Sequence, residues 1–68
     1  MAVYECFFFS DGMIQYWENI AVRSGDHLVA ALRKRLFEGE WTFAEAWFGE
    51  ALVCRVDRSM RAYRHYAA

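Results

Sequence analysis

Two cysteines and two histidines are the residues of this sequence that could supply a thiol nucleophile or hold zinc. A thiol–imidazole pair needs Cys6 or Cys54 beside His27 or His65. Both cysteines alternate into the apolar faces of predicted strands, where a thiol is inert and its pKa rises. The four residues also lack the closely spaced ligand pairs of structural zinc sites. We therefore predict buried cysteines with no catalytic or metal-binding role, and no cofactor.

Carboxylates within apolar strands are the second possible source of chemistry. Glu5, Glu18 and Glu45 occur in predicted strands, where loss of solvent would raise the pKa of a carboxyl group. Glutamates in strands are more often exposed, or discourage pairing at a sheet edge. The sequence has no glycine-rich phosphate loop, and residues 10–12 form a turn signal. We expect no enzyme; a small enzyme or enzyme subunit with a strand carboxylate as acid or base is an alternative.

The composition describes a short and unusually aromatic chain. Its 68 residues predict one domain, 1–68, near the lower size limit for independent folding. Hydrophobic residues make up 57% and aromatic residues 19%. One layer of helix on one layer of sheet can hardly enclose so many rings, so we expect some of them to line a second interface. The absence of a signal-like start, a membrane-length apolar run and a CxxC pair predicts a cytoplasmic protein with free thiols and no membrane contact.

The charges are few in total but unevenly placed. The formal net charge of −1 argues against a generally basic nucleic-acid binder. Residues 55–68 carry four arginines and one aspartate, whereas residues 38–50 carry four glutamates and no basic residue. This polarity supports either association between subunits or two ordinary solvated surfaces.

A β-hairpin is predicted at the start of the chain. Residues 3–9 and 13–20 are rich in β-branched and aromatic side chains, and Ser10-Asp11-Gly12 lies between them. A two-residue turn would set Glu5 opposite Glu18 and mix polar with apolar residues on both faces. We therefore expect a three-residue loop, in which Gly12 takes the positive φ of a bulge.

The three-residue loop divides this hairpin into a core face and an outer face. It pairs Phe8 with Ile14, and it pairs Cys6 with Tyr16. Glu18 is the polar misfit on the core face. The predicted core face consists of Ala2, Tyr4, Cys6, Phe8, Ile14, Tyr16 and Ile20. The predicted outer face consists of Val3, Glu5, Phe7, Phe9, Met13, Gln15, Trp17 and Asn19, which is too aromatic to face water comfortably.

A helix is predicted over residues 27–38. Ser24-Gly25-Asp26 provides an N-cap, and Gly39 is placed to end the helix. Arg35 falls close to the apolar stripe, so we expect its aliphatic part to lie along that stripe and its charge to reach solvent. The stripe itself consists of Leu28, Val29, Leu32 and Leu36.

Residues 41–57 fit either a short helix after a capping box at residues 42–45, or a second hairpin. A Gly49-Glu50 turn pairs Trp47 with Leu52, Glu45 with Cys54, and Phe43 with Val56. We favour the hairpin, although Glu45 on its inner face has no explanation. The predicted inner face holds Trp41, Phe43, Trp47, Leu52, Cys54 and Val56; the predicted outward residues are Thr42, Ala44, Ala46, Arg55 and Asp57.

The expected fold is therefore α+β, with the order β-β-α-β-β, a four-stranded antiparallel sheet and the central helix on one face. Residues 59–68 suit a short C-terminal helix or a frayed tail. If residues 59–68 are helical, Arg61, Arg64 and His65 share one face, and Arg58 stands just before it. These arginines suit an acidic protein, a phosphate-rich ligand or the glutamates of another subunit.

The outer face of the first hairpin suggests a function. Its aromatic side chains can bury against a second copy or another protein. Alternatively, single-stranded nucleic acid stacks on the rings while the arginines bind phosphates, although the hairpin carries only acidic charges. In a third case a C-terminal helix simply covers this face through Met60, Tyr63 and Tyr66. We predict a non-catalytic, homodimeric protein-binding module. Its predicted binding residues are Phe7, Phe9, Met13, Trp17, Arg58, Arg61 and Arg64.

Overall fold

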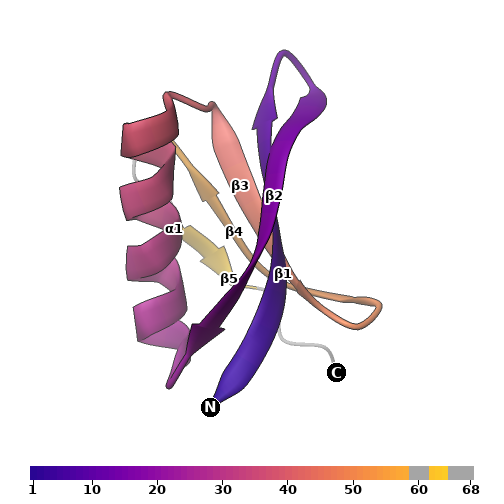
Figure 1. Ribbon diagram of the computed structural model, residues 1–68, viewed down its shortest axis with the longest axis vertical. Helices are drawn as coiled ribbons and strands as arrows, with labels where there is room; N and C mark the ends of the chain where they lie inside the picture. The colour runs from indigo at the N-terminus through magenta and orange to yellow at the C-terminus, as the bar shows by residue number, and fades with distance from the viewer. Residues whose placement is uncertain (59–61, 65–68) are drawn as a thin grey trace.

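The chain forms one antiparallel sheet with one helix on one of its faces (Figure 1). A computed structural model describes residues 1–58 and, for the backbone, residues 62–64. The sheet order is β2-β1-β3-β4-β5, and each pair of neighbours is antiparallel. The predicted α+β class, element order and position of the helix are confirmed. The elements are β1 (Ala2–Ser10), β2 (Met13–Val22), α1 (Gly25–Gly39), β3 (Phe43–Phe48), β4 (Ala51–Asp57) and β5 (Ala62–Arg64).

Two ambiguities in the second half of the chain are resolved. Residues 43–57 form a hairpin, so the short helix after a capping box is wrong. Residues 62–64 form β5, which pairs with β4, so the predicted C-terminal helix is wrong at these positions. The rest of that predicted helix, residues 59–61 and 65–68, lies outside the described residues.

Helix α1 begins as its sequence predicts. Ser24 has an extended backbone, with φ −150° and ψ 167°, and its Oγ accepts a hydrogen bond from the backbone N–H of His27 at 3.4 Å. The carbonyl of Ser24 accepts from the N–H of Leu28 at 3.1 Å. The side-chain bond satisfies one of the amide groups that the first turn leaves without helical partners, and the carbonyl accepts the first hydrogen bond of the helix itself. The buried side chains of α1 are the predicted ones, Leu28, Val29, Leu32 and Leu36.

The residue that ends α1 in the left-handed conformation is Glu40, not the predicted Gly39. Glu40 takes the left-handed conformation, with φ 58°, while Gly39 is still the last helical residue. Gly39 is needed for another reason, because a Cβ atom at this position would lie inside the ring of Trp41. The ring of Trp41 therefore packs directly on the helix backbone and closes the end of the core.

The first hairpin has a two-residue turn, so the predicted three-residue loop is wrong. Asp11 and Gly12 both have positive φ, 55° and 74°, as a type I′ turn requires. The strands pair Phe9 with Ile14, then skip Gln15 and pair Phe8 with Tyr16. This bulge returns the rest of β2 to the expected faces. Ile14, which precedes the bulge, lies on the other face and is 54% exposed rather than in the core, and Tyr16 keeps the inner face but is 44% exposed.

The second hairpin repeats this construction. Its turn is at Gly49-Glu50, with Gly49 at φ 62°, and Trp47 pairs with Leu52 as predicted. The register then skips Val53. In both hairpins the skipped residue is the third after the turn. Because a one-residue shift exchanges the two faces of a strand, the predicted pairs Glu45–Cys54 and Phe43–Val56 are wrong.

The corrected register puts two alanines, not two aromatic residues, beneath the helix. Ala44 and Ala46 have no exposed surface, whereas Phe43 and Trp47 lie on the opposite face. Across the inner face, Ala44 lies between Phe8 and Val56. Small side chains at these positions leave room for the leucines of α1. The buried core is Cys6, Phe8, Ile20, Leu28, Val29, Leu32, Leu36, Ala44, Ala46, Cys54 and Val56.

Candidate protein-interaction face

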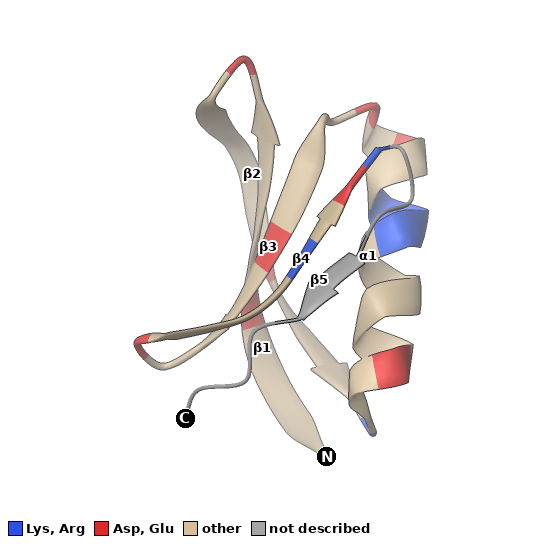
Figure 2. Cartoon of the chain, turned by 180° about the vertical axis from the view of Figure 1, so that it is seen from behind, with Lys and Arg blue, Asp and Glu red and all other residues tan. Residues whose placement is uncertain are grey.

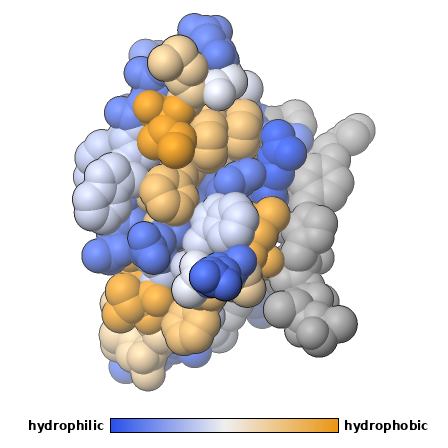
Figure 3. Space-filling model, turned by 90° about the vertical axis from the view of Figure 1, so that its right-hand side faces the viewer, coloured by the Kyte–Doolittle hydropathy of each residue, from blue (hydrophilic) through white to orange (hydrophobic). Residues whose placement is uncertain are grey.

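The face of the sheet away from α1, here called the outer face, carries Phe7, Phe9, Trp17, Phe43 and Trp47, which the buried core excludes. Figure 3 shows this face, with apolar atoms gathered over its upper part, hydrophilic atoms across its middle and further apolar atoms below. By strand register the outer face contains Val3, Glu5, Phe7 and Phe9 of β1; Ile14, Trp17 and Asn19 of β2; Phe43, Glu45 and Trp47 of β3; and Leu52, Arg55 and Asp57 of β4.

Phe9 and Phe43 form a stacked pair of rings on the outer face. Their ring centroids are 4.4 Å apart, and their planes differ by 8°. The guanidinium carbon of Arg55 lies 4.2 Å from the centroid of the Phe43 ring. The three side chains therefore contact one another in series, with the guanidinium placed over the Phe43 ring by cation–π attraction.

Glu45 has a role on the outer face that the predicted inner position did not explain. Its Oε1 accepts a hydrogen bond from the indole Nε1–H of Trp47 at 3.1 Å. It lies opposite Phe7 on one side and opposite Arg55 on the other. Figure 2 shows the acidic and basic positions of β3 and β4 next to each other. The carboxylate therefore orients one aromatic side chain and lies beside a positive charge.

The predicted binding residues of the first hairpin are brought together in part. Phe7 and Trp17 are cross-strand partners on the outer face, and Phe9 lies in the next row. Trp17 is 57% exposed, and the two phenylalanines are half-buried. Met13 does not share this position, because it pairs with Ser10 at the end of the strand and Ile14 takes its predicted place beside Phe9.

Arg58, whose side chain the structure describes, does not join this group. Arg58 donates through Nη1 to the carbonyls of Leu36 and Trp41, each at 3.2 Å, so it ties the end of β4 to the end of α1. Its guanidinium also lies 5.8 Å from the ring of Phe37. Arg64 lies in β5, where its backbone pairs with Cys54. Arg61 lies outside the described residues.

The cysteines are placed for packing. Cys6 and Cys54 are both buried, and they are not joined in a disulfide. Burial raises the pKa of the Cys6 thiol to about 12, and the negative charge of Glu18 adds to the effect. His27 is exposed at the start of α1, where its Nδ1 lies 2.9 Å from Ser24 Oγ. Among the residues that the structure describes, no three side chains of His, Cys, Asp or Glu are grouped to hold a metal ion.

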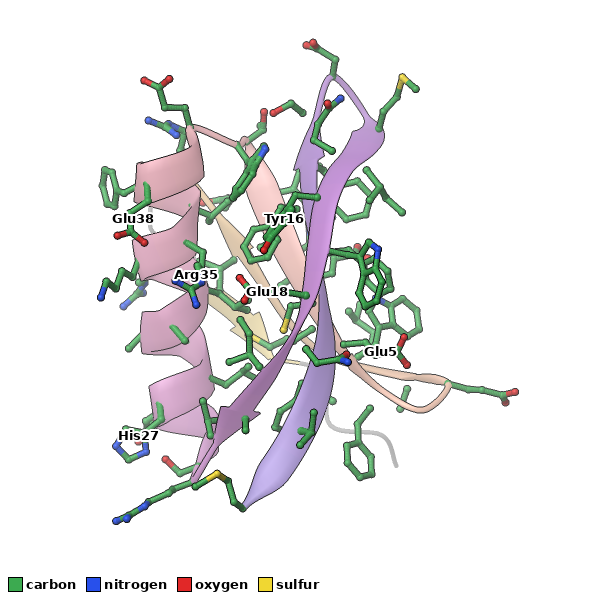
Figure 4. The ribbon with its side chains drawn as sticks, in the orientation of Figure 1. Glu5, Tyr16, Glu18, His27, Arg35 and Glu38 are labelled. Atoms are coloured by element: carbon green, nitrogen blue, oxygen red, sulfur yellow. The ribbon has the colours of Figure 1, made fainter. Side chains whose placement is uncertain are left out.

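The three strand carboxylates occupy separate environments. Glu5 is exposed on the outer face, where it lies opposite Asn19 and Trp47. Glu18 lies on the inner side of β2 and pairs with Arg35, whose Nε is 2.7 Å from Glu18 Oε1. Figure 4 shows this pair on the helix side of the sheet and Glu5 on the other side. The polar misfit of the predicted core face is thus neutralised by the arginine next to the apolar stripe.

Sequence reasoning placed Arg55 outward correctly but missed Ile14, Phe43, Trp47 and Leu52 as members of the outer face. The signal for the last three was the conflict over Glu45, which a one-residue shift after the Gly49-Glu50 turn would have removed. The same shift moves the rings of β3 away from the helix and places small residues beneath it.

Comparison with protein-family models, with curated proteins and with solved structures found no match to this chain. Within the part of the chain that the structure describes, no helix has the length and apolar character to cross a membrane.

Proposed function

We propose that this chain is a non-catalytic protein-binding module, and that its outer face binds a second copy of the chain. The observation that supports the proposal most directly is the aromatic surface on the side of the sheet that α1 does not cover. Trp17 is 57% exposed, and Val3 and Ile14 are each 54% exposed. With the half-buried rings beside them, these residues expose on the order of 500 Å² of apolar surface over the two apolar areas of this face, as much as the largest patch on a typical monomer, which is often functional.

The dimensions of the molecule set the strength expected of such a dimer. The Cα atoms extend over 29 × 20 × 20 Å, so one face offers close to the smallest area seen in specific complexes. A dimer of this size is expected to dissociate in the micromolar range, on the order of 8 kcal/mol of binding free energy. The exchange between monomer and dimer should therefore depend on concentration in an ordinary sedimentation experiment.

The arrangement of charges favours one geometry for the pair. A two-fold axis parallel to the strands, between β1 and β3, lays β4 of one copy over β2 of the other. Arg55 then faces Trp17 of the second copy, and Phe9 faces Phe43. No carboxylate faces another carboxylate. An axis across the strands through the same row would set Glu45 against Glu45, which is unfavourable in a buried interface.

The same charges favour protein over nucleic acid. Phosphate binding along an aromatic platform requires several basic groups around the rings. On the described outer face Arg55 is accompanied by Glu5, Glu45 and Asp57. We further propose a reducing compartment such as the cytoplasm, because the two buried cysteines are not joined in a disulfide.

Sedimentation velocity over a range of concentrations tests the proposal. Wild type should shift from monomer to dimer, while Trp17→Glu should remain monomeric because loss of the buried indole outweighs any ion pair that the new glutamate forms with Arg55 of the second copy. Ile14→Glu should have the same effect, because the same axis sets position 14 against Asp57 of the second copy. Lys34→Glu, an exposed change on α1, is the matched control and should dimerise as wild type does.

Two outcomes would contradict the proposal. One is a wild-type monomer at every concentration with unchanged outer-face amide signals. The other is equal dimerisation of wild type and Trp17→Glu. A mobility shift of a single-stranded oligonucleotide at low salt that Arg55→Glu abolishes would favour the nucleic-acid alternative instead.

A further inference from the structure

A groove runs between α1 and β2 on the inner side of the sheet, separate from the outer face. Its volume is about 340 Å³, at the small end of the range for ligand sites and sufficient for one long side chain. Figure 4 shows Tyr16 and Glu18 on β2 facing Arg35 on α1 across this gap, with Glu38 about one turn farther along the helix. The lining residues are Tyr16, Glu18, Arg35, Glu38, Gly39 and Trp41.

The donors of Arg35 are already directed at resident carboxylates. Its Nε lies 2.7 Å from Glu18 Oε1, and its Nη2 donates to Glu18 Oε2 at 3.4 Å. Its Nη1 lies 3.8 Å from Glu38 Oε1, beyond hydrogen-bond distance. Each carboxylate can accept several hydrogen bonds, so Glu18 and Glu38 keep unused acceptor capacity. The three guanidinium nitrogens of Arg35, in contrast, all lie toward these two carboxylates. The groove therefore retains acceptor capacity and a net negative charge, and a cationic donor complements it.

The other wall of the groove is aromatic. The rings of Tyr16 and Trp41 are stacked, with centroids 5.2 Å apart and planes that differ by 4°. Trp41 is held in turn against Phe8, at 4.9 Å, and against the backbone of Gly39. Tyr16 is 44% exposed. A rigid aromatic surface opposite carboxylates is the setting in which a guanidinium or ammonium group gains cation–π attraction and an ion pair together.

The strand that forms this wall is also an edge of the sheet. Among the described residues, β2 pairs with β1 alone, over Met13–Val22. A long edge strand presents backbone groups to which an extended peptide can add as a further strand. Because side chains alternate along such a peptide, every second one would face the helix side, where the groove lies.

We propose that this groove binds an arginine or lysine side chain of an extended segment of another protein, which pairs with the free edge of β2. The site does not depend on the proposed dimer, because its residues lie on the opposite side of the sheet. The cation would lie against the ring of Tyr16 and form an ion pair with Glu38. Backbone hydrogen bonds to β2 would supply the rest of the binding free energy.

The test uses capped, threonine-rich peptides with one central arginine, added to the full-length, isotope-labelled chain. Binding is followed by NMR through the β2 amides, the Trp41 indole N–H and the Arg35 Nε–H. We expect the arginine peptide to bind about fivefold more tightly than the same peptide with citrulline, which keeps the shape but removes the charge. Methylation of alternate peptide nitrogens should weaken binding to a similar degree, because it prevents strand pairing.

Two variants locate the charge effect. Glu38→Gln should reduce the preference for arginine over citrulline to less than about twofold, because a carboxylate facing the groove is lost. Glu50→Gln, the same change in the turn of the second hairpin, should keep the full preference. Equal affinity of the arginine and citrulline peptides, or an unchanged preference in Glu38→Gln, would overturn the proposal. Trp17→Glu should bind the peptide normally, so failure here is distinguishable from failure of the dimer.

Discussion

Arg35 of α1 reaches across to β2, where its Nε lies 2.7 Å from the Oε1 of Glu18. Each residue alone is a misfit, an arginine beside the apolar stripe of the helix and a glutamate on the core face of a strand. Together they form a charge-assisted pair at the margin of the inner face, where Glu18 is 21% and Arg35 45% exposed. The pair thus fastens the helix to the edge strand without burying a lone charge.

Replacing Glu18 by Gln should lower the free energy of unfolding by about 0.5–1 kcal/mol, since partly exposed pairs contribute modestly. The loss should shrink at high salt, which screens the wild-type pair. Urea unfolding of Glu18→Gln, Arg35→Gln and the double variant measures the coupling between the two residues. A coupling indistinguishable from zero at low salt would contradict the role assigned to this contact.

Gly39→Ala should destabilise the chain even though alanine is the better helix former. The added Cβ would occupy the position of the Trp41 ring, which cannot rotate freely because it packs on Phe8 and Tyr16. We expect a loss of about 1–3 kcal/mol, typical of overpacking. Gly25→Ala is the matched control, because no atom lies near its added Cβ. Thermal unfolding that ranks Gly39→Ala as the more stable variant would be inconsistent with this packing.

Deletion of Gln15 should be tolerated better than deletion of Asn19, although both shorten β2 by one residue. Gln15 is skipped by the register, so its loss leaves the pairs Phe8–Tyr16 and Phe9–Ile14 available. Loss of Asn19 would turn Ile20 out of the core, a change that costs about 2–5 kcal/mol. Circular dichroism and urea unfolding compare the two. Similar midpoints for both deletions would show that the bulge does not set the faces of the strand.

The raised pKa of Cys6 predicts a loss of stability in alkali. Its ordinary pKa is 9.0 and burial raises it to about 12, so the unfolded chain releases the proton first as pH rises. The contribution of the neutral Cys6 thiol to the free energy of unfolding is intact below pH 9. Above pH 9 it falls by about 1.4 kcal/mol per pH unit, until the folded thiol itself ionises. Urea unfolding from pH 8 to 11 should show a shallower decline for Cys6→Ala than for wild type. Parallel declines would refute the assignment.

Local sequence determined the elements of this protein. The cap at Ser24 and the stripe of leucines specify α1, because a helix is defined by contacts within a few residues. Asp11-Gly12 and Gly49-Glu50 specify where the two hairpins turn, because the positive φ values at Asp11, Gly12 and Gly49 suit few other residues. From these elements alone the α+β class and the covering of one face by the helix followed.

Tertiary packing decided which face of each strand is buried. Both turns were visible in the sequence, but the skipped residues Gln15 and Val53 were not, and one skipped residue reverses every later side chain. The choice depends on what fits beneath α1, where Ala44 and Ala46 leave room and Phe43 and Trp47 would not. The outer aromatic face and the groove beside Arg35 exist only after that choice, because residues distant in the chain form both.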